Sequence, residues 1–196
     1  MIKDKIVLML MGPSGCGKST LEKGLCAISG VKKAISVTTR PPRECEKDGV
    51  DYHFITVDEF NALHNQQELV QTTEFGGNYY GSAASEYGTD DHTVTLCVVP
   101  TSAKTFKESL YKMFSNIHCL FVYFDISENR LMENMIARGD TNEMINERLA
   151  QDDLKDQFEQ TGIVPDYVIT DETLNENTLA YVCLWLEQQQ EIMRNG

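Results

Sequence analysis

The stretch of sequence that decides the fold is residues 6–20, IVLMLMGPSGCGKST. Residues 6–11 form an unbroken apolar run, which is typical of a strand buried on both faces of a parallel sheet. Residues 12–19, GPSGCGKS, match the pattern G-x-x-x-x-G-K-[ST] in full. A strand, a glycine-rich loop and helix-forming residues follow one another in the order that a phosphate-binding loop requires. The stretch therefore predicts a site for a nucleoside triphosphate.

The expected roles within this loop follow from its chemistry. Glycines allow successive backbone N–H groups to point at phosphate oxygens, and a helix that begins near Lys18 adds its positive end. We expect Lys18 to contact the outer phosphates as a catalytic residue, and the Ser19 hydroxyl to bind Mg²⁺. The residues predicted to bind the cofactor ATP are Gly12, Pro13, Ser14, Gly15, Cys16, Gly17, Lys18, Ser19 and Thr20. The alternative is a glycine-rich turn that binds no ligand.

The composition narrows the class of protein. The chain has 196 residues, of which 41% are apolar and 24% charged, as expected for one globular domain. Its net charge of −13 argues against nucleic acid or an anionic membrane as a partner, so an anionic substrate must be attracted by a local basic cluster. The six cysteines and four histidines form no metal-binding pattern. Without a recognisable signal peptide or membrane span, we expect a cytoplasmic protein with reduced thiols, as a monomer or homodimer.

Apolar runs alternate with amphipathic segments along most of the chain. The runs predict strands over residues 6–11, 34–37, 94–99, 118–124 and 167–170. The other segments predict helices over residues 18–28, 57–66, 101–114, 127–137, 142–160 and 175–194. Their expected N-caps are Thr56 or Asp58, Thr101 or Ser102, and Asp125 or Ser127. This alternation is typical of an α/β fold with a parallel sheet.

Residues 36–90 have a different pattern. Short, polar strands are predicted at residues 51–56, 68–75 and 78–81, the last two joined by a turn at Gly76 and Gly77. These strands predict a small mixed lobe inserted in the main sheet. The loop TTRPPR, residues 38–43, holds Arg40 and Arg43 on a stiff segment, because proline fixes φ and restricts the residue before it. Two arginines held in this way suit bidentate binding of a phosphate group.

Four segments together resemble the guanylate kinase family of nucleoside monophosphate kinases. They are GPSGCGKST (12–20), SVTTRPPR (36–43), DGVDYHFITVDEF (48–60) and GNYYGS (77–82). The resemblance implies phosphoryl transfer from ATP and Mg²⁺ to a purine nucleoside monophosphate, GMP or dGMP. It also implies one domain with a parallel-sheet P-loop NTPase core (residues 1–35 and 91–196), an inserted small mixed α/β NMP-binding lobe (about 36–90) and a helical lid (about 138–150).

The resemblance assigns further site residues. The residues implied to hold the acceptor phosphate are Arg40, Arg43, Tyr52 and Tyr80. Glu46 stands at the position that orients the arginines. The residues implied to read the base are Ser36, Gln71 and Ser82. Arg138 and Arg148 resemble the catalytic lid arginines that close over ATP. Alignment on Arg138 places Asn134 where the family has another arginine. For Arg148 the alternative is an ion pair with acids on its own helix.

The sequence departs from the family where the base is read. The family has a glutamate at the end of a segment resembling ELVE, and this chain has Gln71 there. The family's D-x-D-x-Q-G segment is replaced by CVVPTS, residues 97–102, so two acidic side chains are lost. A carboxylate accepts from the N1–H and N2–H₂ donors of guanine, whereas a neutral amide both donates and accepts. Gln71 therefore favours a changed or broadened base, with the 2-aminoadenine deoxynucleotide a candidate beside dGMP; the alternative is weaker binding of guanine by its carbonyl oxygen.

Two other functions remain as alternatives. Guanylate-kinase-like domains also occur as non-catalytic modules that bind phosphorylated peptides, and the loss of the two acids is compatible with such a role. The complete P-loop, together with Arg40 and Arg43, favours the enzyme. A P-loop kinase for a small metabolite other than a nucleotide is disfavoured by the set of two arginines and two tyrosines.

Overall fold

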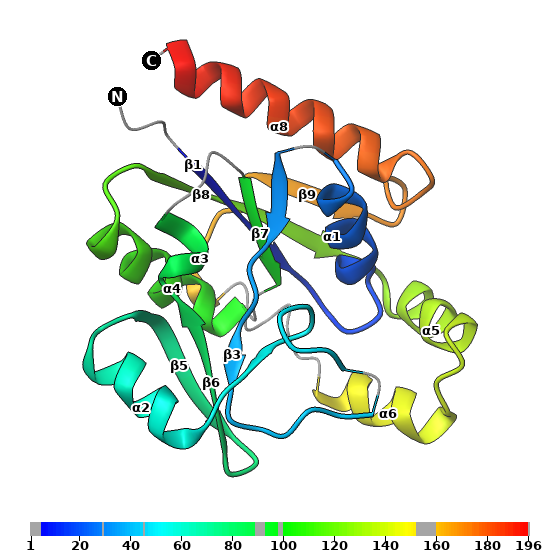
Figure 1. Ribbon diagram of the computed structural model, residues 1–196. Coiled ribbons are helices and arrows are strands. Elements are labelled where there is room, and N and C mark those ends of the chain that lie inside the picture. Colours follow the sequence, from blue (N-terminus) through cyan, green and yellow to red (C-terminus); the bar gives the residue numbers. More distant parts are fainter. Residues whose placement is uncertain are drawn as a thin grey trace.

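Two β-sheets organise the computed structural model, which describes residues 5–28, 30–44, 46–88, 93–97, 100–151 and 160–195. The larger sheet is parallel throughout, in the order β2-β7-β1-β8-β9. Its strands are β2 (Val31–Lys33), β7 (Thr93–Cys97), β1 (Lys5–Met11), β8 (Ile117–Asp125) and β9 (Tyr167–Thr170). The predicted α/β class with a parallel sheet is confirmed (Figure 1).

Strand β1 lies at the centre of this sheet and is buried along its whole length. Val7, Met9 and Met11 pack into the hydrophobic cluster on one face, and the residues between them pack into the cluster on the other. This explains why the sequence of β1 is apolar without alternation, since both faces of a parallel sheet are covered by helices.

The helices cover the two faces unequally. Helices α1 (Lys18–Cys26), α5 (Glu128–Ala137) and α8 (Thr178–Asn195) contribute to one cluster, and α4 (Pro100–Met113) contributes to the other. Helix α6 (Asn142–Gln151) follows α5 (Figure 1). No helix within the described ranges has the length and apolar character needed to cross a membrane.

The smaller sheet is mixed and has the order β4-β3-β6-β5. Its strands are β4 (His53–Phe54), β3 (Val37–Thr38), β6 (Asn78–Ala83) and β5 (Leu69–Phe75). Helix α2 (Val57–Asn65) packs on it through Phe60, and the short helix α3 (Ser85–Gly88) follows β6. All these elements fall within residues 36–90, where the mixed lobe was predicted; that this part and the lid form separate functional units stays a prediction.

Several predicted element boundaries are wrong, and a tertiary contact explains one of them and a local turn another. Of the strand predicted over residues 34–37 only Val37 lies in a strand, β3; residues 34–36 link β2 to β3, and the Ile35 N–H donates to the Glu86 carboxylate at 3.1 Å. Helix α8 begins at Thr178 and not at residue 175, because Asn175 accepts from the Asn177 N–H and forms a turn before the helix. The strand predicted at 51–56 is reduced to β4.

The predicted helix caps are partly confirmed. Thr56 caps α2 in a reciprocal capping box with Glu59, and Ser127 caps α5. Thr101 and Ser102 lie inside α4, which begins at Pro100, a residue suited to the first helical position because it has no N–H to leave unbonded. Helix α6 accounts for the beginning of the helix predicted over residues 142–160, and residues 152–159 lie outside the described part of the chain.

Candidate functional site

The loop after β1 has a conformation that only glycine tolerates at two positions. Gly12 has φ of 151° and Gly15 has φ of 81°. A Cβ on Gly12 would lie 2.7 Å from the Phe124 Cβ, and one on Gly15 would lie 2.9 Å from the Met135 Cγ. The loop is therefore packed tightly against β8 and α5, and a side chain at either position would displace it.

Helix α1 begins at this loop without a side-chain cap. Its N-cap residue is Gly17, with φ of 102°, which has no side chain that could accept a hydrogen bond from the first turn. The first-turn N–H groups of a helix have no intrahelical partner, and they carry the positive end of the helix dipole. A phosphate group fits this position because its oxygens can accept from these N–H groups.

The Lys18 ammonium group lies over the same loop. It donates to the carbonyl oxygens of Gly12 at 2.7 Å and Pro13 at 2.8 Å, and its Nζ is 3.6 Å from the Cys16 Sγ. Burial raises the pKa of the Cys16 thiol, although the nearby Lys18 opposes this shift. Cys16 is therefore a neutral packing residue at ordinary pH, and Lys18 carries the positive charge of the loop.

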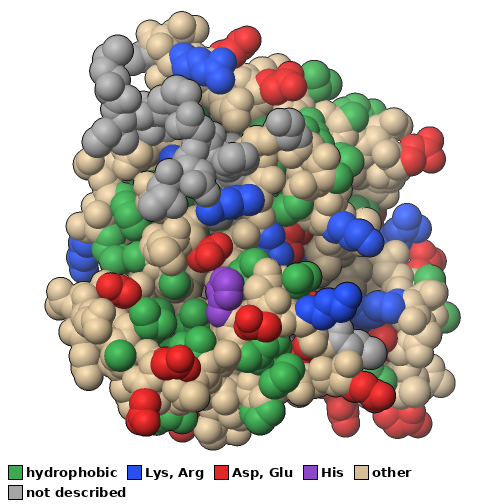
Figure 2. Space-filling model, in the orientation of Figure 1, with side chains coloured by type: hydrophobic (Ala, Val, Ile, Leu, Met, Phe, Trp, Pro, Cys, Tyr) green, Lys and Arg blue, Asp and Glu red, His purple; other side chains and the backbone are tan. Residues whose placement is uncertain are grey.

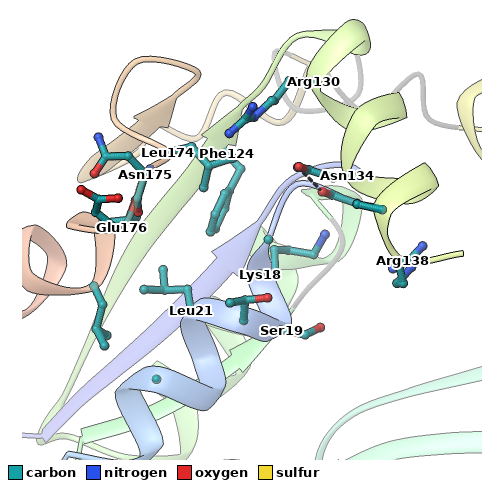
Figure 3. A pocket seen from close by; sticks show the side chains of 17 residues that line it. Lys18, Ser19, Leu21, Phe124, Arg130, Asn134, Arg138, Leu174, Asn175 and Glu176 are labelled. Carbon is teal, nitrogen blue, oxygen red and sulfur yellow. Dashed lines mark hydrogen bonds between the residues drawn. The ribbon is translucent and has the colours of Figure 1, made fainter.

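A cavity of about 830 Å³ opens beside the loop between α1, α5 and the connection from β9 to α8 (Figure 3). The predicted residues Gly15, Gly17, Lys18, Ser19, Thr20 and Arg138 line it. Several further lining residues were not predicted from the sequence, among them Phe124, Arg130, Leu174, Asn175 and Glu176. These residues belong to no motif, and they meet only because β8 and β9 are neighbours in the sheet.

Asn134 joins α5 to the phosphate loop. Its side-chain Nδ2 donates to the main-chain carbonyl oxygen of Gly15 at 2.9 Å (Figure 3). Arg130 lies one helical turn earlier and also lines the cavity. The resemblance predicts an arginine at position 134. The structure has the neutral Asn134 there, bonded to the loop, and the positively charged Arg130 lies one helical turn earlier.

One carboxylate holds both predicted lid arginines. Asp140 accepts from the Nε of Arg138 at 3.2 Å and also from its guanidinium NH₂, and from the Arg148 Nη1 at 2.8 Å. The Asp140 side chain is 10% exposed, compared with 50% for Arg138. Hydrogen bonds from Arg138 hold the pKa of Asp140 below its usual range. Arg148 therefore pairs with an acid, but that acid, Asp140, precedes α6 and does not lie on the helix of Arg148 as the alternative supposed.

The acceptor-side arginines are organised by Glu46. One carboxylate oxygen of Glu46 accepts from the Arg40 Nη2 at 2.8 Å, and the other accepts from the Arg43 backbone N–H at 2.8 Å. The bond from the Arg43 N–H, followed by that from Arg40, lowers the pKa of Glu46. The Arg40 guanidinium is also 5.7 Å from the centre of the Tyr52 ring, which in turn contacts Tyr80 edge to face.

The residues expected to read the base lie on one face of the smaller sheet. Gln71 and Ser82 are direct cross-strand partners in β5 and β6, and Ser36 precedes β3, next to them in the sheet order. Gln71 is half-buried and Ser82 is 8% exposed. The predicted site residues thus lie in two groups, one at the loop after β1 and one on the smaller sheet and the loop between β3 and β4.

The electrostatic pattern of the surface agrees with an anionic substrate. Lys and Arg side chains gather round a hollow on the face that contains the ends of α1 and α5 (Figure 2). Within the described residues no group of three or more His, Cys, Asp and Glu side chains could hold a metal ion. The Ser19 hydroxyl, phosphate oxygens and water are oxygen ligands of the kind that suits Mg²⁺, and Ser19 is the residue predicted to bind this ion.

Comparisons with known proteins agree on one family. Residues 4–188 match the family model described as guanylate kinase. A guanylate kinase from Paraburkholderia xenovorans is 47% identical over 78 residues, and one from Schizosaccharomyces pombe is 49% identical over 78 residues. Each match covers 39% of this chain, and the two matches cover only 35% and 39% of the relatives' own lengths. The crystal structure of guanylate kinase from Anaplasma phagocytophilum has a TM-score of 0.59 at 24% identity, with coverage of 97% of this chain and 89% of that one, which shows a shared fold.

Proposed function

This chain belongs to the guanylate kinase family, and from that premise we propose that it transfers the γ-phosphoryl group of ATP to a purine nucleoside monophosphate of the GMP type. The observation that carries the proposal is the pairing of two anion sites in one fold. The complete phosphate loop with its uncapped helix supports the donor nucleotide. The pair of arginines organised by Glu46 supports a monophosphate acceptor.

On the donor side, the chain binds and orients the triphosphate. Backbone N–H groups of the loop and of the first turn of α1 hold phosphate oxygens, and Lys18 moves from its carbonyl partners to the outer phosphates. Mg²⁺, when bound beside Ser19, neutralises the charge that develops on the phosphates. Arg138 and Arg148 supply further positive charge at the cavity and help to exclude water.

On the acceptor side, Arg40 and Arg43 hold the monophosphate in line for attack. Arg40 is already fixed by Glu46 and by the ring of Tyr52, so little conformational entropy is lost when it binds phosphate. The hydroxyls of Tyr52 and Tyr80 add neutral donors. The reaction needs no covalent enzyme intermediate, because positioning and charge stabilisation carry the catalysis.

The finer part of the proposal concerns the base. Gln71 lies beside Ser82 on the sheet face that would meet the acceptor base, with Ser36 as the third residue that reads it. A neutral amide at this position broadens the range of purine bases that bind. It admits the 2-aminoadenine deoxynucleotide beside GMP and dGMP, because N1 of that base accepts a hydrogen bond and its 2-amino group donates one. A hydrogen-bond mismatch in such a pocket can change discrimination by orders of magnitude.

The test is a coupled assay with ATP and Mg²⁺ across GMP, dGMP, dAMP and the 2-aminoadenine deoxynucleotide. We expect turnover of one or more purine monophosphates, and loss of turnover by at least about a hundredfold in Lys18→Ala. Gln71→Glu should shift the ranking toward guanine, and an unchanged ranking would contradict the role given to Gln71. No turnover with any purine monophosphate would favour a non-catalytic binding module.

A further inference from the structure

Ser82 has a partner that the proposed mechanism does not use. Along β6, Tyr79 and Ala83 pack with Phe60 on one face of the smaller sheet, and a Cβ on Gly81 would meet Phe60 there. Ser82 faces the other side, toward the core cluster that contains Tyr87. A register shift between Leu69 and Gln71 places Gln71 directly opposite Ser82, so both side chains lie on that face.

The Ser82 Oγ lies 2.6 Å from the Tyr87 hydroxyl oxygen, and the bond is buried. Tyr87 is 1% exposed, and its ring packs edge to face on Phe106 at 5.8 Å. Within the described part of the chain, Ser82 is the one group bonded to this hydroxyl. Burial raises the pKa of Tyr87, so the phenol keeps its proton across the physiological range.

Either oxygen of this pair could be the donor, and the burial of the Tyr87 hydroxyl favours donation by Tyr87. A buried O–H group that lacks an acceptor is costly, and the phenol proton of Tyr87 has the Ser82 oxygen as its acceptor. If Tyr87 donates to Ser82, the Ser82 hydroxyl proton is directed to the base. An oxygen at position 6 of a purine accepts a hydrogen bond from Ser82 and completes the series of hydrogen bonds that begins at Tyr87. A 6-amino group leaves the Ser82 proton without an acceptor.

We propose that Tyr87 is a positioning residue that holds Ser82 as a hydrogen-bond donor, and that it thereby makes the enzyme prefer 6-oxo purine monophosphates over their 6-amino analogues. This inference rests on the proposed function and ranks the two candidate bases. Gln71 broadens the range of bases that can bind through their N1 and N2 edge. The Tyr87–Ser82 pair makes dGMP a better substrate than the 2-aminoadenine deoxynucleotide, which differs from dGMP at N1 and position 6.

The experiment compares kcat/KM for dGMP and for the 2-aminoadenine deoxynucleotide in the wild type and in Tyr87→Phe. The wild type should prefer dGMP, and Tyr87→Phe should lower the ratio of the two values about tenfold, because Ser82 is then free to accept from the 6-amino group. Tyr79→Phe removes a hydroxyl from the opposite face of the same strand and should leave the ratio unchanged. Ser82→Ala and Ser82→Ala/Tyr87→Phe should have equal ratios, since Tyr87 acts through Ser82.

The outcomes separate this inference from the function on which it rests. A purely structural role for Tyr87 would lower both kcat/KM values together, so a ratio within twofold of the wild type in Tyr87→Phe overturns the inference. A wild-type preference for the 6-amino base also overturns it. An absence of turnover with every purine monophosphate contradicts the proposed function itself, and the inference with it.

Discussion

The side chain of Asn134 donates a hydrogen bond of 2.9 Å to the carbonyl oxygen of Gly15, so that α5 holds the phosphate loop directly. The two residues are 119 positions apart in the chain. Helix α5 also leads into the arginines of the predicted lid, so one helix contacts the loop proposed to bind the triphosphate and continues into the segment expected to close over it.

We expect Asn134→Ala to weaken ATP binding about fivefold, because a neutral hydrogen bond of this type contributes about 1 kcal/mol. The acceptor KM should not change. The measurement is the Kd for ATP by calorimetry, with Asn129→Ala as control, since Asn129 lies exposed on the same helix. Equal affinities in the two variants would show that the bond does not position the loop.

Asp140→Asn is expected to tighten ATP binding by about two- to fivefold at low salt, with a smaller effect at high salt. Asp140 competes with the phosphates for Arg138 and Arg148, and loss of its charge releases both. Glu147→Gln removes one negative charge from an exposed position on α6 and serves as the control for net charge. Equal gains in both variants would mean that Asp140 has no specific effect.

The stability contributed by Asp140 should depend on pH in a defined direction. Its pKa is lower in the folded protein than in the unfolded chain, so its contribution is complete above the unfolded value of about 4 and is lost as pH falls through the lower folded value. The Tm difference between wild type and Asp140→Asn should therefore be constant above about pH 5 and shrink below about pH 4. Thermal unfolding followed by circular dichroism across this range measures it, and a difference that grows as pH falls would contradict the assignment.

Glu46→Gln should raise the KM for the acceptor about tenfold and leave the KM for ATP unchanged. The charge that fixes Arg40 is lost, and the hydrogen bond to the Arg43 N–H becomes weaker. Glu44→Gln is the matched control, because Glu44 is exposed on the same loop. An effect on ATP as large as that on the acceptor would show that Glu46 is not specific to the monophosphate side.

Thr56→Ala should lower the free energy of unfolding by about 1 kcal/mol, because it removes the hydroxyl that accepts from the Glu59 N–H and donates to the Glu59 carboxylate, while the bond from the Thr56 backbone N–H to Glu59 remains. Thr56→Ser keeps the hydroxyl and should lose much less. Chemical denaturation measures the difference in unfolding free energy between the variants, with the dependence on denaturant concentration expected to be the same in each. If the serine and alanine variants are equally destabilised, the capping bond is not the cause.

Much of the fold could be predicted because it depends on local patterns. The apolar run before Gly12 and the phosphate loop after it predicted β1, α1 and their burial, since strand, loop and helix are consecutive. The caps at Thr56 and Ser127 depend on residues three positions away and were also recognised. The strand predicted over residues 34–37 was wrong at residues 34–36, because the Ile35 N–H is bonded by Glu86, a residue that no local pattern could connect with it.

The sequence by itself determined the family, the phosphate loop and the pair of arginines, because in each case the residues of a motif are close together along the chain. The tertiary structure alone decided that Asn134 holds Gly15, that Asp140 joins Arg138 and Arg148, and that Tyr87 lies behind Ser82. These contacts depend on the order of the strands, on a one-residue register shift in β5 and on the burial of polar groups that must find partners. Spacing along a sequence specifies none of these three conditions.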